Sequence, residues 1–311
     1  MLFLSQADVR RLLDLDELVE ALAGAFREVS AGRTSVPARI AAMVPDRGLL
    51  AAMPGYVGGV LETKLVSVFP HNHERGRPSH QALIVLFDAE TGSPLALLDG
   101  THITALRTAA AAALATRTLA RDDAAILAVL GAGVQGASHL EMLPRVHHFT
   151  EIRVASRDVD RARSLAASVG ARATGSFEEA TRGADVVCCC TDSPEPIISA
   201  SWLKEGAHVT SVGANPRGPE LDSATLRAGL LVVESRAAFL PPPAGCAELQ
   251  GMDPEAAVEL GEVLAGTRPG RVSAAQITVY KSMGHAAEDA VAAALVHRRA
   301  VSEGAGIEVE L

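Results

Sequence analysis

The sequence contains few aromatic residues, which make up 3% of its 311 positions although 48% of the residues are hydrophobic. Any core must therefore be built mainly from Ala, Leu and Val. Charged residues account for 21%, which is typical of a globular chain and excludes a disordered one. A chain of this length can form two domains of ordinary size, each with its own core.

Cysteines and basic clusters are also scarce. The four cysteines include three consecutive ones at positions 188 to 190, a pattern that fits neither a disulfide framework nor a CxxC metal site. We expect these three to be small hydrophobic residues of a buried strand. The net charge is −9 and no basic block is present to displace counterions, which argues against nucleic acid as a partner.

Long apolar runs are absent as well. The alanine-rich stretch 109–115 is too short to span a membrane and is bracketed by Arg107 and Arg117. The first residues lack a basic region and turn acidic at Asp8, which does not match a signal peptide. These features predict a cytoplasmic protein that has no membrane partner.

A glycine-rich turn is the most informative stretch of the chain. The apolar run 126–130 leads into Gly131-Ala132-Gly133-Val134-Gln135-Gly136, and a second strand-like segment follows at 151–155. In the spacing G-x-G-x-x-G, the first glycine permits a tight turn and the second lets the backbone approach a pyrophosphate. The third lets the following helix pack closely on the strand, and the helix N-terminus offers N–H groups to the phosphates. The sequence therefore predicts a dinucleotide site.

Hydrophobic patterning divides the chain into two regions. After two amphipathic helices, the segments 38–44, 49–53, 60–69, 81–87 and 94–98 predict a mainly antiparallel sheet. An alanine-rich helix at 104–119 follows, and strands then alternate with helices, as in a doubly wound parallel sheet. We expect an α/β protein with a Rossmann domain over residues 119–284. A mainly antiparallel α+β domain would comprise residues 1–118 and a terminal helix within residues 285–311.

The choice of cofactor depends on the end of the second strand of the Rossmann domain. An acidic residue there binds the ribose hydroxyls of NAD, whereas a nearby arginine suits the 2′-phosphate of NADP. This chain has Ser156-Arg157-Asp158 at that point. Arg157 favours NADP(H), because its guanidinium can stack on adenine and pair with a phosphate. Asp158 keeps NAD(H) open as the alternative.

Three cations stand in otherwise apolar segments. Lys64 shares one strand face with several valines, and a buried ammonium must be paired or functional; the alternative is a surface pair with Glu62. Arg39 lies in an apolar strand, and Arg107 lies near the start of the alanine-rich helix. Two guanidiniums and one ammonium together suit a substrate carboxylate.

A histidine pair and the nucleophile motifs carry less information. His71 and His73 have no further ligand cluster at a metal-binding spacing, so a polar loop is expected and no metal site. No Ser/His/Asp signature and no GKS/T phosphate loop is present.

The ordered series of motifs resembles the ornithine cyclodeaminase / mu-crystallin family over essentially the whole chain. The segments Pro78-Ser-His-Gln81 and Leu130-Gly-Ala-Gly-Val-Gln135 are especially similar to the mu-crystallin, ketimine-reductase side of the family. The other matching segments are 53–56, 63–65, 99–100, 103–110, 206–208, 212–215, 220–222, 259–263 and 281–284.

This resemblance implies a homodimer in which the first domain, completed by the C-terminal helix, forms the interface and the substrate pocket. By position, Arg39 and Arg107 would hold the substrate carboxylate, and Lys64 would polarise the substrate nitrogen or exchange protons with it. The further pocket positions would be Met53, Ser79, His80, Asn215 and Glu248.

The resemblance also assigns the cofactor-binding positions. Thr108, Ala132, Val134 and Gln135 would line the pyrophosphate, together with the three glycines of the turn. Ser156 and Arg157 would hold the adenosine end. Thr191 and Val212 would lie near the nicotinamide half.

One position departs from the cyclodeaminases of this family. They carry an aspartate that acts as a base in ring closure, whereas this chain has Asn215, and an amide cannot accept a proton at neutral pH. We therefore expect an NAD(P)H-dependent oxidoreductase acting on the C–N bond of an α-imino or α-amino acid. Reduction of a cyclic ketimine, of the pyrroline- or piperideine-2-carboxylate type, is favoured. The alternatives are an ornithine or lysine cyclodeaminase using bound NAD, an amino-acid dehydrogenase such as alanine dehydrogenase, and a non-catalytic binding protein.

Overall fold

The protein forms two compact units, described by a computed structural model that covers residues 1–213, 215 and 218–310. One unit comprises Met1–Arg107 with His285–Leu311, and the other Thr108–Gly284. The boundary lies inside helix α3 (Gly100–Leu119), whereas the sequence pattern suggested the end of that helix. A continuous helix carries no sequence signal for the point at which its packing partners change.

The first unit contains a seven-stranded mixed sheet in the spatial order β15-β1-β6-β5-β4-β3-β2. Neighbours from β2 to β6 are antiparallel, which confirms the mainly antiparallel sheet. The short outer strands β1 and β15 were not predicted, since two or three residues show no periodicity. The bounds are β1 Leu2–Leu4, β2 Ile40–Val44, β3 Gly48–Val57, β4 Val60–Val68, β5 His80–Phe87, β6 Pro94–Asp99 and β15 Ile307–Glu308.

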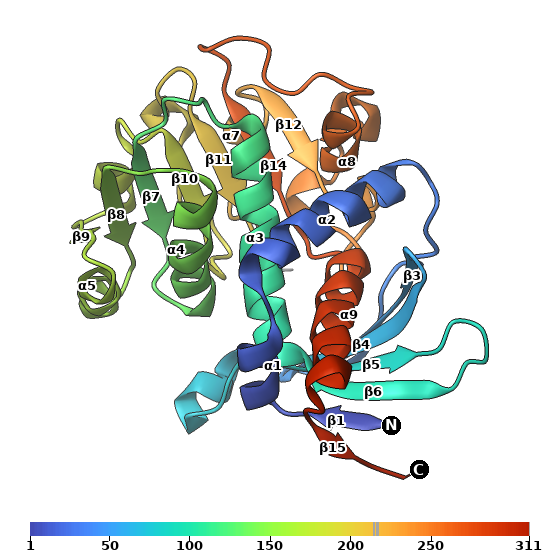
Figure 1. The fold of residues 1–311 in the computed structure, drawn as a ribbon. Helices are drawn as coiled ribbons and strands as arrows, with labels where there is room; N and C mark the ends of the chain where they lie inside the picture. The colour runs from blue at the N-terminus through green and yellow to red at the C-terminus, as the bar shows by residue number, and fades with distance from the viewer. Residues whose placement is uncertain (214, 216–217, 311) are drawn as a thin grey trace. The chain divides into compact units, whose positions relative to one another are not determined.

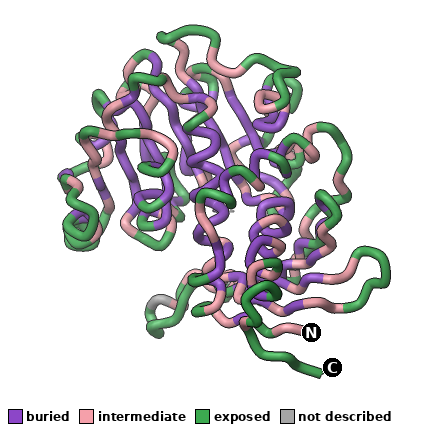
Figure 2. The backbone as a smooth tube through the Cα atoms, in the orientation of Figure 1, coloured by how far each residue is buried: buried purple, intermediate pink, exposed green. Residues whose placement is uncertain are grey.

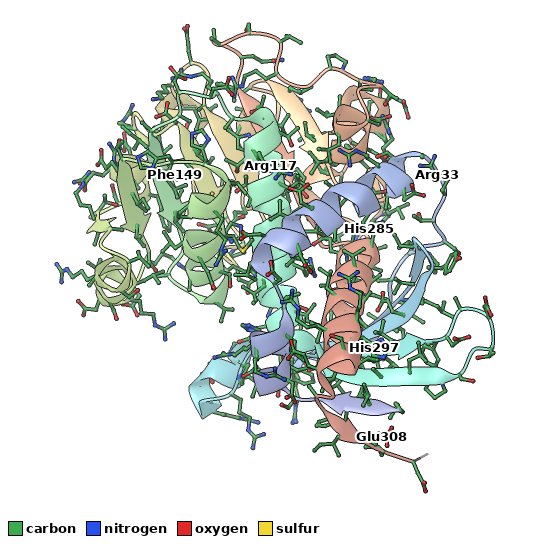
Figure 3. All side chains as sticks on the ribbon, in the orientation of Figure 1. Arg33, Arg117, Phe149, His285, His297 and Glu308 are labelled. Carbon is green, nitrogen blue, oxygen red and sulfur yellow. The ribbon has the colours of Figure 1, made fainter. Side chains whose placement is uncertain are left out.

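Helix α9 (Ala286–Glu303) covers one face of this sheet and contacts β3, β4 and β5 (Figure 1). Its first turn is buried, and the chain is purple along much of the helix in Figure 2. The Nδ1 atom of His285 accepts the N–H of Ala287 at 3.2 Å and so caps the helix, along which His297 lies further on (Figure 3). The unit also contains α1 (Gln6–Leu12), α2 (Leu15–Ser30) and the 3₁₀ segment Pro70–Arg75.

The second unit contains an eight-stranded sheet in the order β13-β12-β14-β11-β10-β7-β8-β9, and every neighbouring pair is parallel. This confirms the predicted Rossmann architecture. The bounds are β7 Ile126–Leu130, β8 Glu151–Ala155, β9 Arg172–Ala173, β10 Val186–Cys189, β11 His208–Ser211, β12 Leu230–Val233, β13 Val258–Glu259 and β14 Thr278–Lys281. The helices besides α3 are α4 Val134–Val146, α5 Val159–Ser168, α6 Phe177–Thr181, α7 Ser223–Leu226 and α8 Leu260–Leu264.

The order of these strands reverses between β7 and β10. From β7 the chain moves outward through β8 and β9, and from β10 it moves outward through β11 on the other side (Figure 1). In parallel open sheets, ligands bind at the carboxyl ends of the strands next to such a reversal. The loops after β7 and β10 are therefore where a dinucleotide site is expected.

The two most apolar stretches are interior elements. Ala109–Ala115 of α3 is fully buried, and so are the free cysteines Cys188 and Cys189 of β10. Burial raises the pKa of the Cys188 thiol to about 12, so this thiol is not a nucleophile at neutral pH. Among the described residues, no helix is both long and apolar enough to cross a membrane.

Candidate active site

The glycine turn follows β7 at the strand reversal. Gly131 has φ +121°, which favours glycine, and a Cβ there would lie 2.5 Å from the Cys190 carbonyl oxygen. A Cβ on Gly136 would lie 1.9 Å from the Gly131 carbonyl oxygen. These two glycines are therefore required for the turn itself and for the close packing of α4 upon it.

Gly133 has a different role, because none of the described residues lies within 4 Å of the position of its missing Cβ. It is the N-cap of α4, and no side chain in the described part of the chain caps this helix start. The next residue, Val134, is 71% exposed, although it begins a helix behind a buried strand. Open space, helix N–H groups and the positive end of the dipole match a pyrophosphate, so these residues fit a dinucleotide.

The end of β8 presents Ser156 and Arg157. Ser156 Oγ accepts the N–H of Asp158 at 3.2 Å, and exposed Arg157 directly follows. The Asp158 carboxylate caps α5 by accepting the N–H of Arg161 at 3.1 Å and also pairs with the Arg161 side chain at 3.2 Å. The Asp158 carboxylate is therefore already bonded at the start of α5, whereas Arg157 is exposed to solvent.

The loops after β10 and β11 carry Thr191, Val212 and Asn215. Val212 donates its N–H to the Cys189 carbonyl at 3.1 Å, and the amide of buried Asn215 donates to the Asp192 carbonyl at 2.9 Å. Asn215 therefore links the two loops through its Nδ2 atom. Thr108, also assigned to the cofactor, is buried in α3 of the same unit.

In the first unit, Lys64 is the centre of a buried charge cluster. It is 1% exposed, and its Nζ lies 2.7 Å from Oδ2 of fully buried Asp289 on α9. Arg107 donates from Nε to Asp289 Oδ1 at 3.0 Å and from Nη1 to Glu288 Oε2 at 2.7 Å. Two adjacent acids of one helix turn thus compensate two cations from β4 and α3.

Burial and neighbouring charges shift the protonation of this cluster. Burial, aided by Arg107, lowers the pKa of Lys64 to about 8, although Asp289 opposes the shift. Burial and the charge of Asp289 raise the pKa of Glu62 to about 9, so this carboxyl is protonated at neutral pH. Burial also opposes ionisation of Asp289, but Arg107 and Lys64 outweigh it and lower its pKa. At neutral pH the cluster therefore contains ionised Asp289, protonated Glu62 and a lysine ammonium that gives up its proton more readily than an exposed lysine does.

Lys64 does not form the surface pair with Glu62 that the sequence analysis gave as the alternative. Glu62 is 1% exposed, and neither of its oxygens has a hydrogen-bond partner among the described residues. The partner is Asp289, which sequence reasoning missed together with Glu288. The available signal was a pair of adjacent acids within the alanine-rich start of the last helix, where the pattern otherwise indicates burial.

The other proposed substrate residues lie at different distances from Lys64. Met53 is buried directly opposite Lys64 in the β3–β4 register. Arg39 immediately precedes β2, and its charge also contributes to the lowered pKa of Lys64. His80 lies at the exposed start of β5, about 13 Å along the strand from Ile84, which is paired with Lys64.

Two more positions assigned by resemblance take part in local contacts. Ser79 donates its hydroxyl to the Pro70 carbonyl at 3.2 Å, within the loop before β5. In the second unit, Glu248 pairs with buried Lys281 at 2.8 Å. Exposed His71 contacts Glu74 at 3.0 Å, and the side chain of His73 lies outside the described part of the chain.

The parallel sheet and the glycine turn at its strand reversal define the second unit as a dinucleotide-binding domain. The first unit adds a buried cluster of cations and acids. The chain belongs to the ornithine cyclodeaminase/mu-crystallin family, whose family model matches residues 1–304.

Known members of the family are similar to this chain over nearly its whole length. Ketimine reductase mu-crystallin of Mus musculus is 40% identical over 305 residues, which cover 95% of this chain and 96% of that protein. The structure of Thermococcus litoralis Delta(1)-pyrroline-2-carboxylate reductase in complex with NADH and L-proline has a TM-score of 0.93 and 35% identity, covering 99% of this chain and 100% of that one. An archaeal alanine dehydrogenase dimer with bound NAD has a TM-score of 0.90 and 32% identity, covering 100% of this chain and 99% of that one.

Proposed function

We propose that this protein is an NAD(P)H-dependent reductase of cyclic α-imino acids of the pyrroline- or piperideine-2-carboxylate type. The observation that carries the proposal is the buried Lys64–Asp289–Arg107 cluster in a chain that also has a dinucleotide turn. The similar proteins from Mus musculus and Thermococcus litoralis, a ketimine reductase and a pyrroline-carboxylate reductase, support this substrate class.

A nicotinamide cofactor held at the glycine turn would supply a hydride for the carbon of the C=N bond. The π bond breaks, the nitrogen gains one proton, and a cyclic amino acid is formed. Arg39 and Arg107 bind the substrate carboxylate, which fixes the orientation of the imine carbon. Lys64 donates the proton to the nitrogen, and its pKa of about 8 makes it a suitable acid near neutral pH.

For the cofactor, NADP(H) is the preferred choice in this proposal. The solvent-exposed Arg157 and the neighbouring Ser156 suit a 2′-phosphate, and Asp158 is occupied as the cap of α5. NAD(H) is the alternative, supported by the family structures that contain NADH or NAD.

A second candidate function is that of an amino-acid dehydrogenase. The resemblance to the archaeal alanine dehydrogenase favours it, and the same residues would bind an acyclic imino acid. Cyclodeamination is disfavoured, because Asn215 stands at the position of the base and its amide already donates to the Asp192 carbonyl.

The test is a spectrophotometric assay with purified protein. NADPH or NADH is mixed with pyrroline-2-carboxylate, piperideine-2-carboxylate, or pyruvate plus ammonia, and the fall in cofactor absorbance is followed. Cofactor oxidation with a cyclic imine supports the proposal, whereas oxidation with pyruvate and ammonia alone establishes the dehydrogenase. Ammonia release from ornithine without a net change in cofactor absorbance would show a cyclodeaminase.

We also propose that the protein is a homodimer through the exposed face of the first unit's sheet. The residues Ile40, Leu50, Leu65 and Leu83 are 71, 49, 38 and 46% exposed and lie on the face opposite Lys64. An apolar sheet face of this kind is suited to a second copy, and the related alanine dehydrogenase is a dimer. Sedimentation should give a dimer for the native chain and a monomer for Ile40→Glu/Leu50→Glu; a native monomer would contradict this.

A further inference from the structure

A buried carboxylate, Glu220, connects the two loops that follow β10 and β11. Its Oε1 accepts the N–H and the hydroxyl of Thr191, both at 2.6 Å. Its Oε2 accepts the Ser211 hydroxyl at 2.8 Å and the Gly213 N–H at 2.9 Å. Glu220 is 1% exposed, so four donors, from the two loops and from the end of β11, replace the water that a carboxylate otherwise binds.

The approach of the second loop to this carboxylate leaves no room for a side chain. A Cβ on Gly213 would lie 2.6 Å from Glu220 Oε2 and 2.9 Å from the Thr191 carbonyl oxygen. The backbone at Gly213 is therefore in close contact with the Glu220 carboxylate on one side and with the Thr191 loop on the other, and these contacts fix its position. Asn215 follows two residues later and adds its bond to the Asp192 carbonyl.

A lysine and a second glutamate extend this network to a third strand. Fully buried Lys281, at the end of β14, donates to Ser211 Oγ at 2.9 Å and pairs with Glu248 at 2.8 Å. Glu248 in turn accepts the Leu221 N–H at 3.1 Å. Burial raises the pKa of Glu220, and Lys281 with the Thr191 and Ser211 donors opposes that shift. The network thus connects the carboxyl ends of three neighbouring parallel strands.

These strand ends lie on the β10 side of the strand reversal, opposite the glycine turn that follows β7. In a doubly wound sheet, a dinucleotide crosses the reversal, with its adenosine half on one side and its nicotinamide half on the other. Ser156 and Arg157 follow β8, on the adenosine side. Thr191 and Gly213 therefore occupy the side that receives the nicotinamide.

We propose that Glu220 is a positioning residue for the nicotinamide half of the cofactor, because it fixes the Thr191 and Gly213 loops that this half contacts. The inference rests on the proposed dinucleotide binding. Glu220 itself touches neither cofactor nor substrate and acts through the two loops. Lys281 is the cation that stabilises the Glu220 carboxylate, and its contacts with Ser211 and Glu248 hold it in place.

The substitution Glu220→Gln tests this with little change in volume. One carboxylate oxygen becomes an amide N–H₂ group, which cannot accept a hydrogen bond. The two protein donors that bound this oxygen lose their acceptor, so the link to one of the two loops is lost. The affinities of the native and variant proteins are measured for NADPH, for NADH and for ADP-ribose with and without a 2′-phosphate. ADP-ribose lacks the nicotinamide ring, so it reports the turn and the adenosine side alone.

The expected result is that Glu220→Gln binds the reduced cofactor about tenfold more weakly, which corresponds to about 1.4 kcal/mol, while the ADP-ribose affinity is unchanged. Equal loss for both ligands, or no loss for either, would overturn the positioning role. If the native protein binds none of these ligands, the proposed function itself is wrong. The surface variant Glu178→Gln, which removes an exposed pair with Arg182, is the matched control.

Ser211→Ala provides a second variant in case Glu220→Gln does not fold. It removes one of the four donors to Glu220 and one acceptor of Lys281, and leaves the ionised groups in place. The same split is expected, with a smaller loss for the reduced cofactor. A larger kinetic isotope effect with C4-deuterated cofactor should accompany it, because a less ordered ring slows hydride transfer. An equal loss of affinity for the reduced cofactor and for ADP-ribose in this variant would also contradict the inference.

Discussion

The Asp289 carboxylate pairs with Lys64 at 2.7 Å and accepts a hydrogen bond from Arg107 at 3.0 Å. One side chain of the C-terminal helix thus sets the charge environment of two cations that belong to a strand and to another helix. An acid between two buried cations stabilises both, and its loss leaves each of them without part of its compensation.

Asp289→Asn should therefore shift the pH dependence of catalysis. Removing the negative charge lowers the pKa of Lys64 further below its value of about 8, so the lysine loses its proton at lower pH. The high-pH limb of kcat/KM for the cyclic imine should move down by about one unit, equivalent to about 1.4 kcal/mol. An unshifted limb would mean that Lys64 is not the proton donor.

The same variant should be less stable by about 3–5 kcal/mol, since it breaks a buried pair on one side only. Denaturant unfolding at pH 7 measures this. Glu303→Gln, which removes an exposed pair between the same helix and Arg11, serves as the control and should stay near the native value.

Glu62→Gln should change how stability depends on pH. The pKa of Glu62 is raised to about 9 in the folded protein against 4.5 for the free group, so the folded state holds a proton that the unfolded state releases. The native protein therefore loses stability as pH rises from about 4.5 to 9, and the variant lacks this slope. Melting temperatures of the two proteins should diverge with rising pH in favour of the variant; parallel curves would show that Glu62 is ionised in the fold.

Gly133→Ala and Gly136→Ala should affect different properties. An added Cβ at Gly133 meets none of the residues that the structure describes, so this variant should fold normally. It should bind dinucleotide more weakly, by at least about tenfold, because the methyl group occupies the place of the pyrophosphate. At Gly136 the Cβ would lie 1.9 Å from the Gly131 oxygen, so folding itself should suffer. Melting temperature and cofactor affinity, measured together, separate the two effects; normal affinity in Gly133→Ala would place the pyrophosphate elsewhere.

Arg157→Leu should lower the affinity for NADPH about tenfold and leave NADH nearly unchanged, because only NADPH carries the phosphate that pairs with a guanidinium. Arg163→Leu on the neighbouring helix, where the side chain forms an exposed pair with Asp160, is the matched control. The prediction is checked by measuring the KM values for NADPH and NADH in the native protein and in both variants. A preference for NADH in the native protein, or equal losses for both cofactors, would contradict this role.

Asn215→Asp should not convert the protein into a cyclodeaminase. The amide donates to the Asp192 carbonyl at 2.9 Å, and an ionised aspartate would instead face that oxygen with a like partial charge. We expect a stability loss of about 1–3 kcal/mol above the pKa of the new carboxyl and no ammonia release from ornithine. If this variant released ammonia from ornithine without a net change in cofactor absorbance, the missing base alone would separate the reductase from the cyclodeaminase.

The sequence alone determined the parallel sheet and its glycine turn, because both depend on local spacing. A strand, a G-x-G-x-x-G turn and a helix are adjacent in the chain, and steric demands at Gly131 and Gly136 act over a few residues. Period-two patterning likewise indicated the five antiparallel strands. The patterning did not predict strand β14, because its four residues follow a loop rich in turn residues and end in a lysine.

The charge partners of buried groups were decided only by the tertiary structure. Lys64 and Arg107 stood out in the sequence as cations among apolar residues, but Asp289 and Glu288, which compensate them, lie far along the chain. The same holds for Lys281, which lies far along the chain from Glu220 and Glu248, the two acids it compensates. A buried charge is stabilised by whichever opposite charges and donors the packing brings within a few ångströms, and that distance depends on the whole fold and not on local spacing.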